Sequence, residues 1–266
     1  MSSTLTARPK PEIGQRVHPN ILLYGGPKTG KTTGALSAPG WILDLNFDMP
    51  NATYFARSRM TEDRIFEVDI PPYREGHNDV DAVLNEVAQT LRQQLEQDGG
   101  FDAVVVDPVH ELHRRLMDEQ SRRAVRPSRD TYGDVAKMIE RFCRFLCEMP
   151  AAAIFVCHDR PIKDEQTGGF ERLPYTGTSN PDLGLKLLGM VDIVAYTGVV
   201  KRENEKPLYV AQLFEGDGRK GGDRFGVLAG QSGFRTLDLA GWFQDIGNPL
   251  MHEGPTPDEP EPPEVN

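Results

Sequence analysis

The chain has 266 residues, of which 38% are hydrophobic and 26% are charged, as is typical of a globular domain with generous loops. A formal net charge of −10 excludes a surface coated with nucleic-acid-binding charge, so any DNA or RNA contact must come from a local basic patch. The cysteines Cys143, Cys147 and Cys157 form no CxxC pair, which argues against a disulfide framework or a zinc site and favours core thiols.

The N-terminal part of the chain contains a phosphate-binding motif. Residues 1–18 are polar and proline-dotted, and we expect a flexible leader ahead of a core that spans 19–247. The apolar run 21–24 predicts a strand that leads directly into the pattern G-x-x-x-x-G-K-T, and a helix is expected over 31–37. A strand, this glycine-rich loop and a helix in succession indicate a nucleotide site rather than a chance turn.

Each part of the motif has a chemical role. Backbone N–H groups of the loop hold phosphate oxygens, Lys31 reaches the β- and γ-phosphates, and the Thr32 hydroxyl completes a Mg²⁺ shell. The sequence therefore predicts binding of ATP with Mg²⁺ by Gly25, Gly26, Pro27, Lys28, Thr29, Gly30, Lys31, Thr32 and Thr33.

The next elements alternate between strands and helices. Apolar or alternating runs predict strands over 41–45 and 64–70, and helical spacing of apolar residues predicts a helix from residue 78 or 79 to about 97. The β-branched run 101–107 predicts a buried parallel strand that ends at Asp107. A carboxylate at the end of such a strand either holds Mg²⁺ or caps the following helix.

Residues 110–130 hold six arginines, the densest basic stretch of the chain. This stretch is either a functional basic loop or the solvated face of a helix. An amphipathic helix is expected over 132–149, followed by a buried strand over 152–157 that ends at His158.

The C-terminal third combines loops and a hairpin. We expect a long loop over 160–184, two strands over 191–200 and 208–214 that form a hairpin, and a flexible loop over 216–222. A last short element is expected over 236–246, and the acidic, proline-rich segment 248–266 is expected to be a disordered tail.

This order of elements, over roughly residues 18–230, resembles the RecA-type ATPase core. Within that group it resembles the phage nucleotide-binding proteins that include the Sak-type single-strand annealing recombinases. The resemblance implies an α/β, RecA-like P-loop NTPase fold, with a mostly parallel central sheet flanked by helices and a C-terminal β-hairpin extension. It also implies that Asp107 is the Walker B carboxylate, and that His158 senses the γ-phosphate, where a capped strand end is the alternative.

The resemblance further implies contacts with single-stranded DNA. The segments 114–130 and 160–184 correspond to the two DNA-binding loops of RecA-like proteins, and the implied DNA contacts are Arg122, Arg123, Arg126, Arg129, Arg160 and Lys163. In a homo-oligomeric ring or filament, a late basic element would reach the nucleotide of the neighbouring subunit. Its residues here are Arg219, Lys220 and Arg224, for which a flexible basic surface loop is the alternative.

One position departs from the family pattern. RecA-type enzymes place a glutamate two residues after the Asp that ends the second strand, whereas this chain has Asn46 there. An amide can hold water but cannot take its proton, so Asp44 or Asp48 would have to substitute. We therefore expect a DNA-stimulated ATPase whose hydrolysis is slow, with Lys31, Asp107, Asp44, Asp48 and His158 as candidate catalytic residues.

Three functions compete at this point. The first is an ATP-switched protein of phage type that binds single-stranded DNA and supports annealing or strand exchange. The second is a P-loop kinase of a nucleotide or small molecule, and the third is a non-catalytic, nucleotide-gated adaptor in a phage replication or packaging complex. The acidic tail would recruit a partner such as a single-strand-binding protein or shield the basic loops. Because no signal peptide or apolar span is present, we expect a cytoplasmic location, in the host cytoplasm if phage-encoded, and no membrane partner.

Overall fold

The structure is a computed structural model that describes residues 18–48, 53–54, 64–69, 80–94, 100–123, 129–163, 168–178, 180–201, 205–228 and 233–247. The predicted tail at 248–266 and, apart from His18, the predicted leader lie outside these residues.

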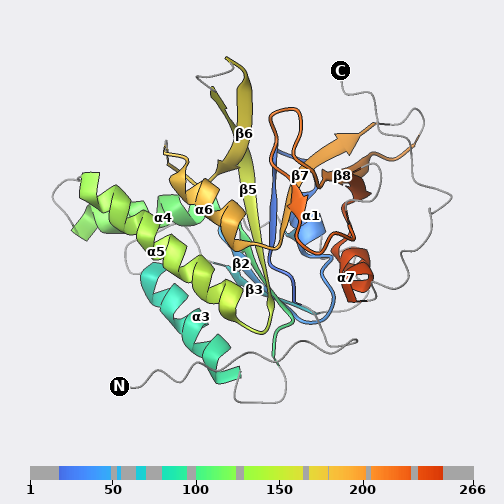
Figure 1. Cartoon of the computed structure of the whole chain (residues 1–266). Helices are drawn as coiled ribbons and strands as arrows, with labels where there is room; N and C mark the ends of the chain where they lie inside the picture. Colours follow the sequence, from blue (N-terminus) through green and yellow to red (C-terminus); the bar gives the residue numbers. More distant parts are fainter. Residues whose placement is uncertain are drawn as a thin grey trace, which may run out of the picture.

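A mixed β-sheet forms the centre of the described part of the chain (Figure 1). Its main path runs β10-β8-β7-β1-β5-β4-β2-β3, while β6 pairs with β5 and β9 pairs with β7. The strands are β1 (Ile21–Gly25), β2 (Ile42–Asn46), β3 (Ile65–Asp69), β4 (Ala103–Asp107), β5 (Ala152–Lys163), β6 (Phe170–Tyr175), β7 (Ile193–Val200), β8 (Leu208–Gln212), β9 (Gly222–Asp223) and β10 (Phe234–Thr236). The helices are α1 (Lys31–Ala35), α3 (Val80–Gln94), α4 (Val109–Arg123), α5 (Arg129–Glu148), α6 (Asp182–Met190) and α7 (Leu239–Gly247).

The central strands are parallel. The pairs β2–β3, β2–β4, β4–β5, β1–β5 and β1–β7 all run in the same direction, whereas β7–β8, β8–β10, β5–β6 and β7–β9 are antiparallel. The predicted α/β class, a mostly parallel sheet flanked by helices with a β7–β8 hairpin near the C-terminus, is therefore confirmed. Parallel strands place their carboxyl ends at one edge of the sheet, where ligands of open α/β folds bind.

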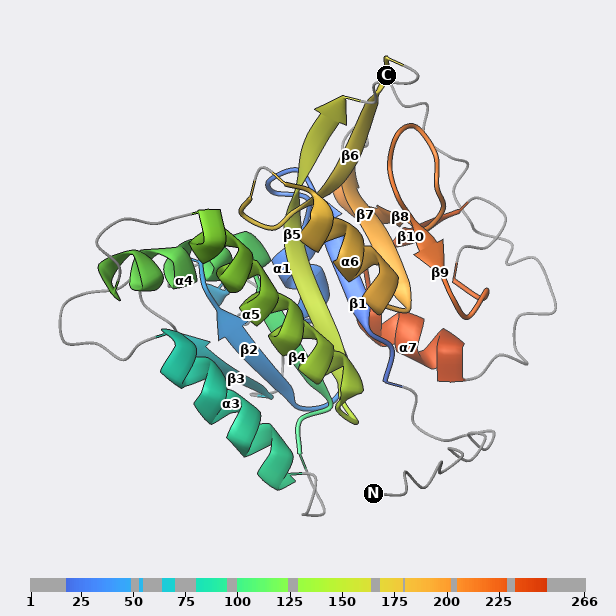
Figure 2. The same ribbon diagram turned by 60° about the vertical axis from the view of Figure 1, so that its left-hand side comes forward.

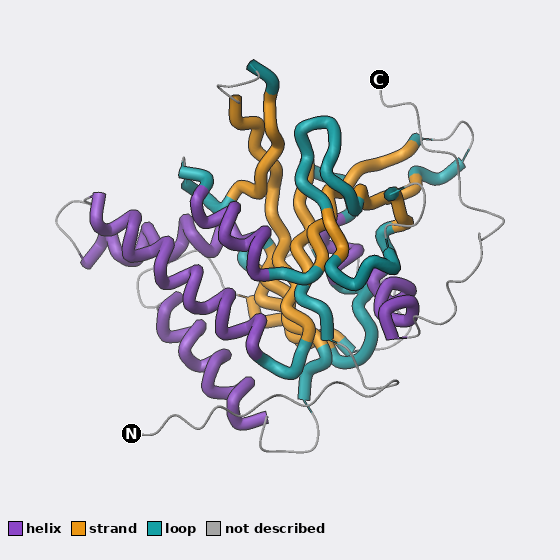
Figure 3. The backbone as a smooth tube through the Cα atoms, in the orientation of Figure 1, coloured by secondary structure: helices purple, strands orange, loops and turns teal. Residues whose placement is uncertain are grey.

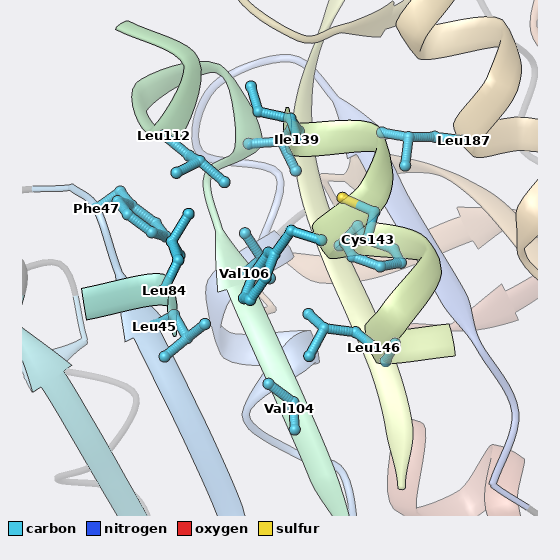
Figure 4. Close-up of a cluster of buried hydrophobic side chains, with 14 of the residues drawn as sticks. Leu45, Phe47, Leu84, Val104, Val106, Leu112, Ile139, Cys143, Leu146 and Leu187 are labelled. Atoms are coloured by element: carbon cyan, nitrogen blue, oxygen red, sulfur yellow. The ribbon is translucent and has the colours of Figure 1, made fainter. Parts of the chain in front are cut away.

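Helices cover both faces of this sheet, as Figures 1 and 2 show together. One face packs against α3, α4, α5 and α6, and Figure 4 shows part of this core, in which Val106 of β4 lies toward Leu112 of α4 and Ile139 of α5, and Val104 toward Leu146 of α5. The other face packs against α1 and α7. Cys143 and Cys157 belong to the first core, which confirms that they are core thiols. Because both faces are covered, the strands are apolar throughout, which is why they could be predicted as buried runs.

The expectation of a long loop over 160–184 is wrong. β5 continues to Lys163 and pairs with β6, so that His158 lies opposite Tyr175 and Lys163 lies opposite Phe170. Figure 3 shows this β5–β6 hairpin as two strands that project beyond the rest of the sheet. Pro161 and Pro174 suggested a loop, but proline is tolerated in edge strands, where one row of N–H groups needs no partner. α6 follows the hairpin and was also missed.

Of the two alternatives for the arginine-rich stretch, the structure supports the helix, and the DNA-binding loop that the resemblance implied over 114–130 is wrong. α4 continues to Arg123 and α5 begins at Arg129, so the connection is confined to 124–128, which lies outside the described residues. Leu112 and Leu116, one helical turn apart, are fully buried and hold α4 against the sheet. The arginines of this stretch therefore belong largely to a helix.

Candidate nucleotide site

The predicted phosphate-binding loop lies at the carboxyl end of β1, between its two neighbours in the sheet. Gly25 is in register with His158 of β5 on one side and with Thr197 of β7 on the other. The Thr29 and Thr197 hydroxyl oxygens are 2.6 Å apart, which fastens the loop to β7. Thr197 was not identified from the sequence, because only the strand pairing places it beside the motif.

The backbone of the loop needs its glycines. Lys28 and Gly30 have φ angles of 62° and 84°, in the left-handed region that curls a backbone so that its N–H groups converge. A Cβ on Gly30 would lie 2.7 Å from the Tyr209 ring. Gly26, by contrast, has only Thr29 near the place of its absent side chain, at 3.9 Å, so the concave side of the loop is open. The loop thus has the shape of a phosphate cradle.

Lys31 supplies positive charge to this cradle. Its side chain is 6% exposed, and Nζ donates hydrogen bonds to the carbonyl oxygens of Gly25, at 3.0 Å, and Gly26, at 2.5 Å. Burial lowers the pKa of Lys31, and the negative charges of Asp107 and Asp159 oppose that shift. A buried ammonium held by neutral carbonyl and hydroxyl groups, which here include Thr29 Oγ1 at 3.4 Å, is suited to exchange them for anionic phosphate oxygens.

Thr32 and Asp107 form the second half of the site. The Thr32 hydroxyl donates to Asp107 Oδ2 at 2.6 Å, across 75 residues of sequence. Burial raises the pKa of Asp107 to about 6, against the lowering effect of the Thr32 hydrogen bond and the nearby Lys31 charge. A hydroxyl and a carboxylate side by side are hard oxygen donors of the kind that Mg²⁺ prefers.

The donor set fits Mg²⁺ bound together with a nucleotide. Among the described residues, no cluster of three or more His, Cys, Asp or Glu side chains could hold a metal ion alone. Mg²⁺ would therefore be held by Thr32, Asp107 and phosphate oxygens, and it would supply charge neutralisation on those phosphates. This composition is normal for Mg²⁺, which keeps few protein ligands.

His158 lies against the loop, as predicted for a phosphate sensor. Its side chain is half-buried, and burial lowers its pKa, as does the charge of Lys31, while a hydrogen bond with the Gly25 backbone acts in the opposite direction. A neutral imidazole therefore stands beside the loop at neutral pH. A second histidine, His110, stacks near it with ring centroids 4.8 Å apart. The sequence signal for His110 was its place just after Asp107, at the start of the next helix.

Asn46 occupies the position next to Asp107 but is engaged in a structural network. The two residues are in register on β2 and β4. Asn46 is buried, donates Nδ2–H to Glu67 Oε1 at 2.7 Å and accepts the Asp48 N–H at 2.9 Å. Thr53 donates a further hydrogen bond to the same Glu67 oxygen at 3.0 Å. The Asn46 amide thus holds β2 to β3, and sequence reasoning missed Glu67 because its partner lies on a neighbouring strand.

The two candidate substitutes for the missing glutamate lie at different depths. Asp44 is fully buried and in register with Val105, two residues below the strand end that carries Asp107. Asp48 is exposed just beyond β2. Its negative charge adds to the raised pKa of Asp107 and opposes the lowering of the His110 and His158 pKa values by burial. Only Asp48 is therefore at the edge where phosphate would lie.

The predicted DNA-binding residues fall into two separate groups. Arg160 and Lys163 lie on the projecting part of β5, where Arg160 donates to the Thr178 carbonyl at 3.0 Å and Lys163 is exposed. Arg122 and Arg123 end α4 and Arg129 begins α5, while Arg126 lies outside the described residues. The rise of an α-helix places the end of α4 about 20 Å along its axis from the first turn after Asp107. Figures 1 and 2 both show this end of α4 apart from the β5–β6 hairpin.

The three residues predicted to act across a subunit boundary do not form one patch. Arg219 stacks over the Tyr196 ring at 4.8 Å, and the Lys220 backbone hydrogen-bonds with the Tyr24 hydroxyl at 2.6 Å, close to the phosphate-binding loop. Arg224 pairs with Asp192 at 3.0 Å, just before β7 begins and hence at the opposite edge of the sheet.

The comparisons with known proteins concern family and fold. The chain matches the AAA domain family over residues 18–234. No curated protein sequence matches it significantly. Of the helices in the described ranges, none is long and apolar enough to cross a membrane.

Three solved structures resemble the chain at low sequence identity. A KaiC-like protein of Pyrococcus horikoshii is 16% identical, with a TM-score of 0.37 over 73% of this chain and 79% of that one. An ATPase of the type III secretion system of pathogenic bacteria is 14% identical, with a TM-score of 0.46 over 70% of this chain and 51% of that one. An uncharacterised Pyrococcus horikoshii protein in complex with an unknown peptide is 14% identical, with a TM-score of 0.41 over 74% of this chain and 84% of that one.

The family match covers most of the chain and includes the phosphate-binding loop, Asp107 and His158. The protein therefore belongs to the AAA domain family and contains a P-loop ATPase-type, nucleotide-binding domain.

Proposed function

We propose that this protein is a RecA-like, ATP-switched protein of the phage Sak type that binds single-stranded DNA and supports annealing or strand exchange. One observation carries the proposal. The strand whose residue His158 contacts the phosphate-binding loop continues without interruption into the projecting β5–β6 hairpin. Loss of the terminal phosphate from the bound nucleotide could thereby alter the position of the exposed β5–β6 hairpin through β5 itself.

The nucleotide half of the proposal rests on the cradle and its ion site. Lys31 and the N–H groups of the loop bind and orient the phosphates, and Asp107 with Thr32 holds Mg²⁺ against them. Burial disfavours the ionised form of the Asp107 carboxyl, so a divalent cation beside it would stabilise this carboxylate strongly. Binding of nucleotide and of Mg²⁺ should therefore reinforce each other.

Hydrolysis is proposed to be slow. Asn46 is committed to Glu67 and the Asp48 backbone, so it is not free to orient water. Asp48 is then the candidate to orient or deprotonate the attacking water. Because phosphoryl transfer depends mainly on positioning and charge stabilisation, a displaced carboxylate would slow turnover rather than abolish binding.

The DNA half rests on the hairpin. Lys163 and Arg160 offer positive charge to a phosphate backbone, and Phe170, directly opposite Lys163, is 66% exposed near the tip. A cation beside an exposed aromatic ring is a common way to hold single strands, through backbone neutralisation and base stacking. The arginines at the end of α4 and the start of α5 would provide a second contact. In a homo-oligomer, Arg219 and Lys220 would act between subunits at the phosphate edge, whereas Arg224 lies at the opposite edge of the sheet and would contact a different part of the neighbour.

A second candidate function is favoured by the engagement of Asn46. If Asp48 does not activate water, the protein would be a nucleotide-gated adaptor in a replication or packaging complex, which needs binding without turnover. DNA affinity that does not depend on nucleotide, together with no turnover, would support this candidate.

The test is binding of a labelled oligonucleotide of single-stranded DNA, followed by fluorescence anisotropy with Mg²⁺ and a non-hydrolysable ATP analogue, with ADP, or with no nucleotide. We expect tight binding with the ATP analogue only, and loss of that dependence in Lys31→Ala. In the Arg160→Gln/Lys163→Gln variant, affinity should fall, and the slope of log K against log salt should decrease by about 1.4, or about 0.7 for each lost phosphate contact.

A control variant that removes the same charge elsewhere distinguishes DNA binding by the β5–β6 hairpin from a general effect of the protein's net charge. Lys137 and Arg144 are exposed on α5, paired with Asp134 and Glu140. Lys137→Gln/Arg144→Gln removes the same charge as the hairpin variant and should leave binding unchanged. Equal losses in both variants would refute the hairpin assignment.

A further inference from the structure

His110 stands at the junction of the nucleotide site and the hairpin. It lies in the first turn of α4, three residues after Asp107, and its side chain is 16% exposed. Its ring centroid is 4.8 Å from that of His158. Burial lowers the pKa of His110 to about 4, and the Lys31 ammonium is near enough to contribute to the same shift. At neutral pH a neutral imidazole thus lies within electrostatic reach of the phosphate-binding lysine.

One nitrogen of this imidazole is unused. Within the described part of the chain, His110 Nδ1 is buried and has no hydrogen-bond partner. Nε2 is 3.7 Å from Glu111 Oε1, beyond hydrogen-bonding distance. A buried polar atom without a partner is costly, so in a native structure it calls for an explanation such as a catalytic role or an ion that binds there. The contact with His158 and the effect of the Lys31 charge place this ring beside the nucleotide site, so a group of the nucleotide is the candidate partner.

The same ring touches both strands of the hairpin. His110 and Tyr175 have centroids 5.6 Å apart, and Tyr175 lies opposite His158 across the β5–β6 ladder. The Arg160 guanidinium lies over the Tyr175 ring, 5.9 Å from its centroid. A shift of the His110 ring would therefore change its contacts with His158 and Tyr175 at the base of the β5–β6 hairpin.

We propose that His110 is a second residue, beside His158, that distinguishes a nucleoside triphosphate from a diphosphate, with Nδ1–H donating a hydrogen bond to the terminal phosphate. The inference rests on the proposed nucleotide binding and extends it to a residue outside the family motifs. Its chemical basis is that a hydrogen bond to an ionised phosphate oxygen is stronger than one to a neutral acceptor, and a diphosphate has no γ-phosphate to accept it. The contact with Tyr175 would then carry the difference to the hairpin.

The test is isothermal titration calorimetry of the full chain with Mg²⁺ and either the triphosphate analogue AMP-PNP or ADP. The quantity compared is the ratio of the two Kd values in the parent, His110→Phe and His110→Asn. Phe keeps the ring contacts but has no nitrogen, so ADP affinity should stay within about twofold while the preference for the triphosphate falls about tenfold. Asn places an amide nitrogen near the position of Nδ1 and should recover part of the preference.

Arg114→Ala is the control. Arg114 lies one turn further along α4, is 63% exposed and pairs with Glu111 at 2.7 Å, so its removal should leave the ratio unchanged. A second readout is the difference in melting temperature between the AMP-PNP- and ADP-saturated forms, which should narrow in His110→Phe alone. If the Phe variant does not fold, His110→Ala takes its place with the same expected loss.

The results of these titrations distinguish a failure of the role of His110 from a failure of the proposed nucleotide-binding function. A parent protein that binds neither nucleotide refutes the proposed function and this inference together. If the parent binds both nucleotides, the role of His110 alone is refuted in either of two cases. In the first, the ratio of the two Kd values is the same in His110→Phe as in the parent. In the second, His110→Phe loses as much affinity for ADP as for AMP-PNP.

Discussion

Replacement of Asp107 by Asn should stabilise the nucleotide-free protein while impairing its use of Mg²⁺. Burial raises the pKa of this carboxyl from 3.8 to about 6, so at neutral pH the folded chain holds an ionised group in an environment that disfavours it. Asn is neutral and has nearly the same shape, and its Oδ1 can still accept the hydrogen bond from Thr32.

The magnitude follows from the two pKa values. Between about pH 4 and pH 6 the folded chain keeps the Asp107 proton and the unfolded chain has lost it, so the free energy of unfolding falls as pH rises through this window. One pKa unit corresponds to about 1.4 kcal/mol, so the full effect is about 3 kcal/mol above pH 7. Asp107→Asn lacks this titration. Its stability advantage should therefore grow by about 1–2 kcal/mol from pH 5 to pH 8.

The assay is urea denaturation of both proteins at pH 5, 6, 7 and 8, without nucleotide or divalent cation. All other titrating groups are shared, so they cancel in the difference between the two proteins. Addition of Mg²⁺ and ATP should reverse the order of stability, because the parent gains binding free energy that the variant cannot. A variant that is less stable than the parent at pH 8 without ligand, or a difference independent of pH, would refute the account of Asp107.

Three further changes test the remaining parts of the site. Gly30→Ala requires a residue with a side chain at φ 84° and places Cβ 2.7 Å from the Tyr209 ring, so urea denaturation should show a loss of at least about 1–2 kcal/mol, with weaker nucleotide binding. Asn46→Glu with Glu67→Gln keeps the hydrogen bond between β2 and β3 but moves the carboxylate next to Asp107, and steady-state ATP turnover should rise at least about tenfold; unchanged turnover with intact binding would contradict the explanation of slow hydrolysis. Asp48→Ala should lower the residual turnover of the parent about tenfold or more while ADP affinity is retained, and full turnover in this variant would exclude Asp48 as the substitute.

The parts of the fold that were predictable are those with an unambiguous local signal. The β-branched run before Asp107 and the glycine-rich motif after β1 each identified a strand end from sequence alone. The β5–β6 hairpin was missed because prolines such as Pro161 and Pro174 indicate a loop when only the local sequence is considered. Strand pairing at the edge of the sheet tolerates both of them. For α4 the dense arginines left a basic loop and a helix face as alternatives, and the buried leucines one turn apart show why the helix forms.

The site shows the same division. Residues within the phosphate-binding motif could be assigned because their chemistry is fixed by spacing. Thr197 and Glu67 reach the site only through strand pairing, so no spacing in the sequence pointed to them. His110 had one signal, its place shortly after Asp107, but its contact with His158 depends on how α4 packs. Asn46 was recognised as a departure from the family pattern, but its engagement with Glu67 on the neighbouring strand is a tertiary fact.

The most direct measurement is calorimetric titration of Mg²⁺ and ATP into the parent chain and into Lys31→Ala, because every functional proposal depends on the cradle around this ammonium. Saturable one-site binding by the parent, weakened at least about tenfold in the variant, is the result that the account predicts. Equal affinity of the two proteins, or a parent that binds no nucleotide, would contradict it.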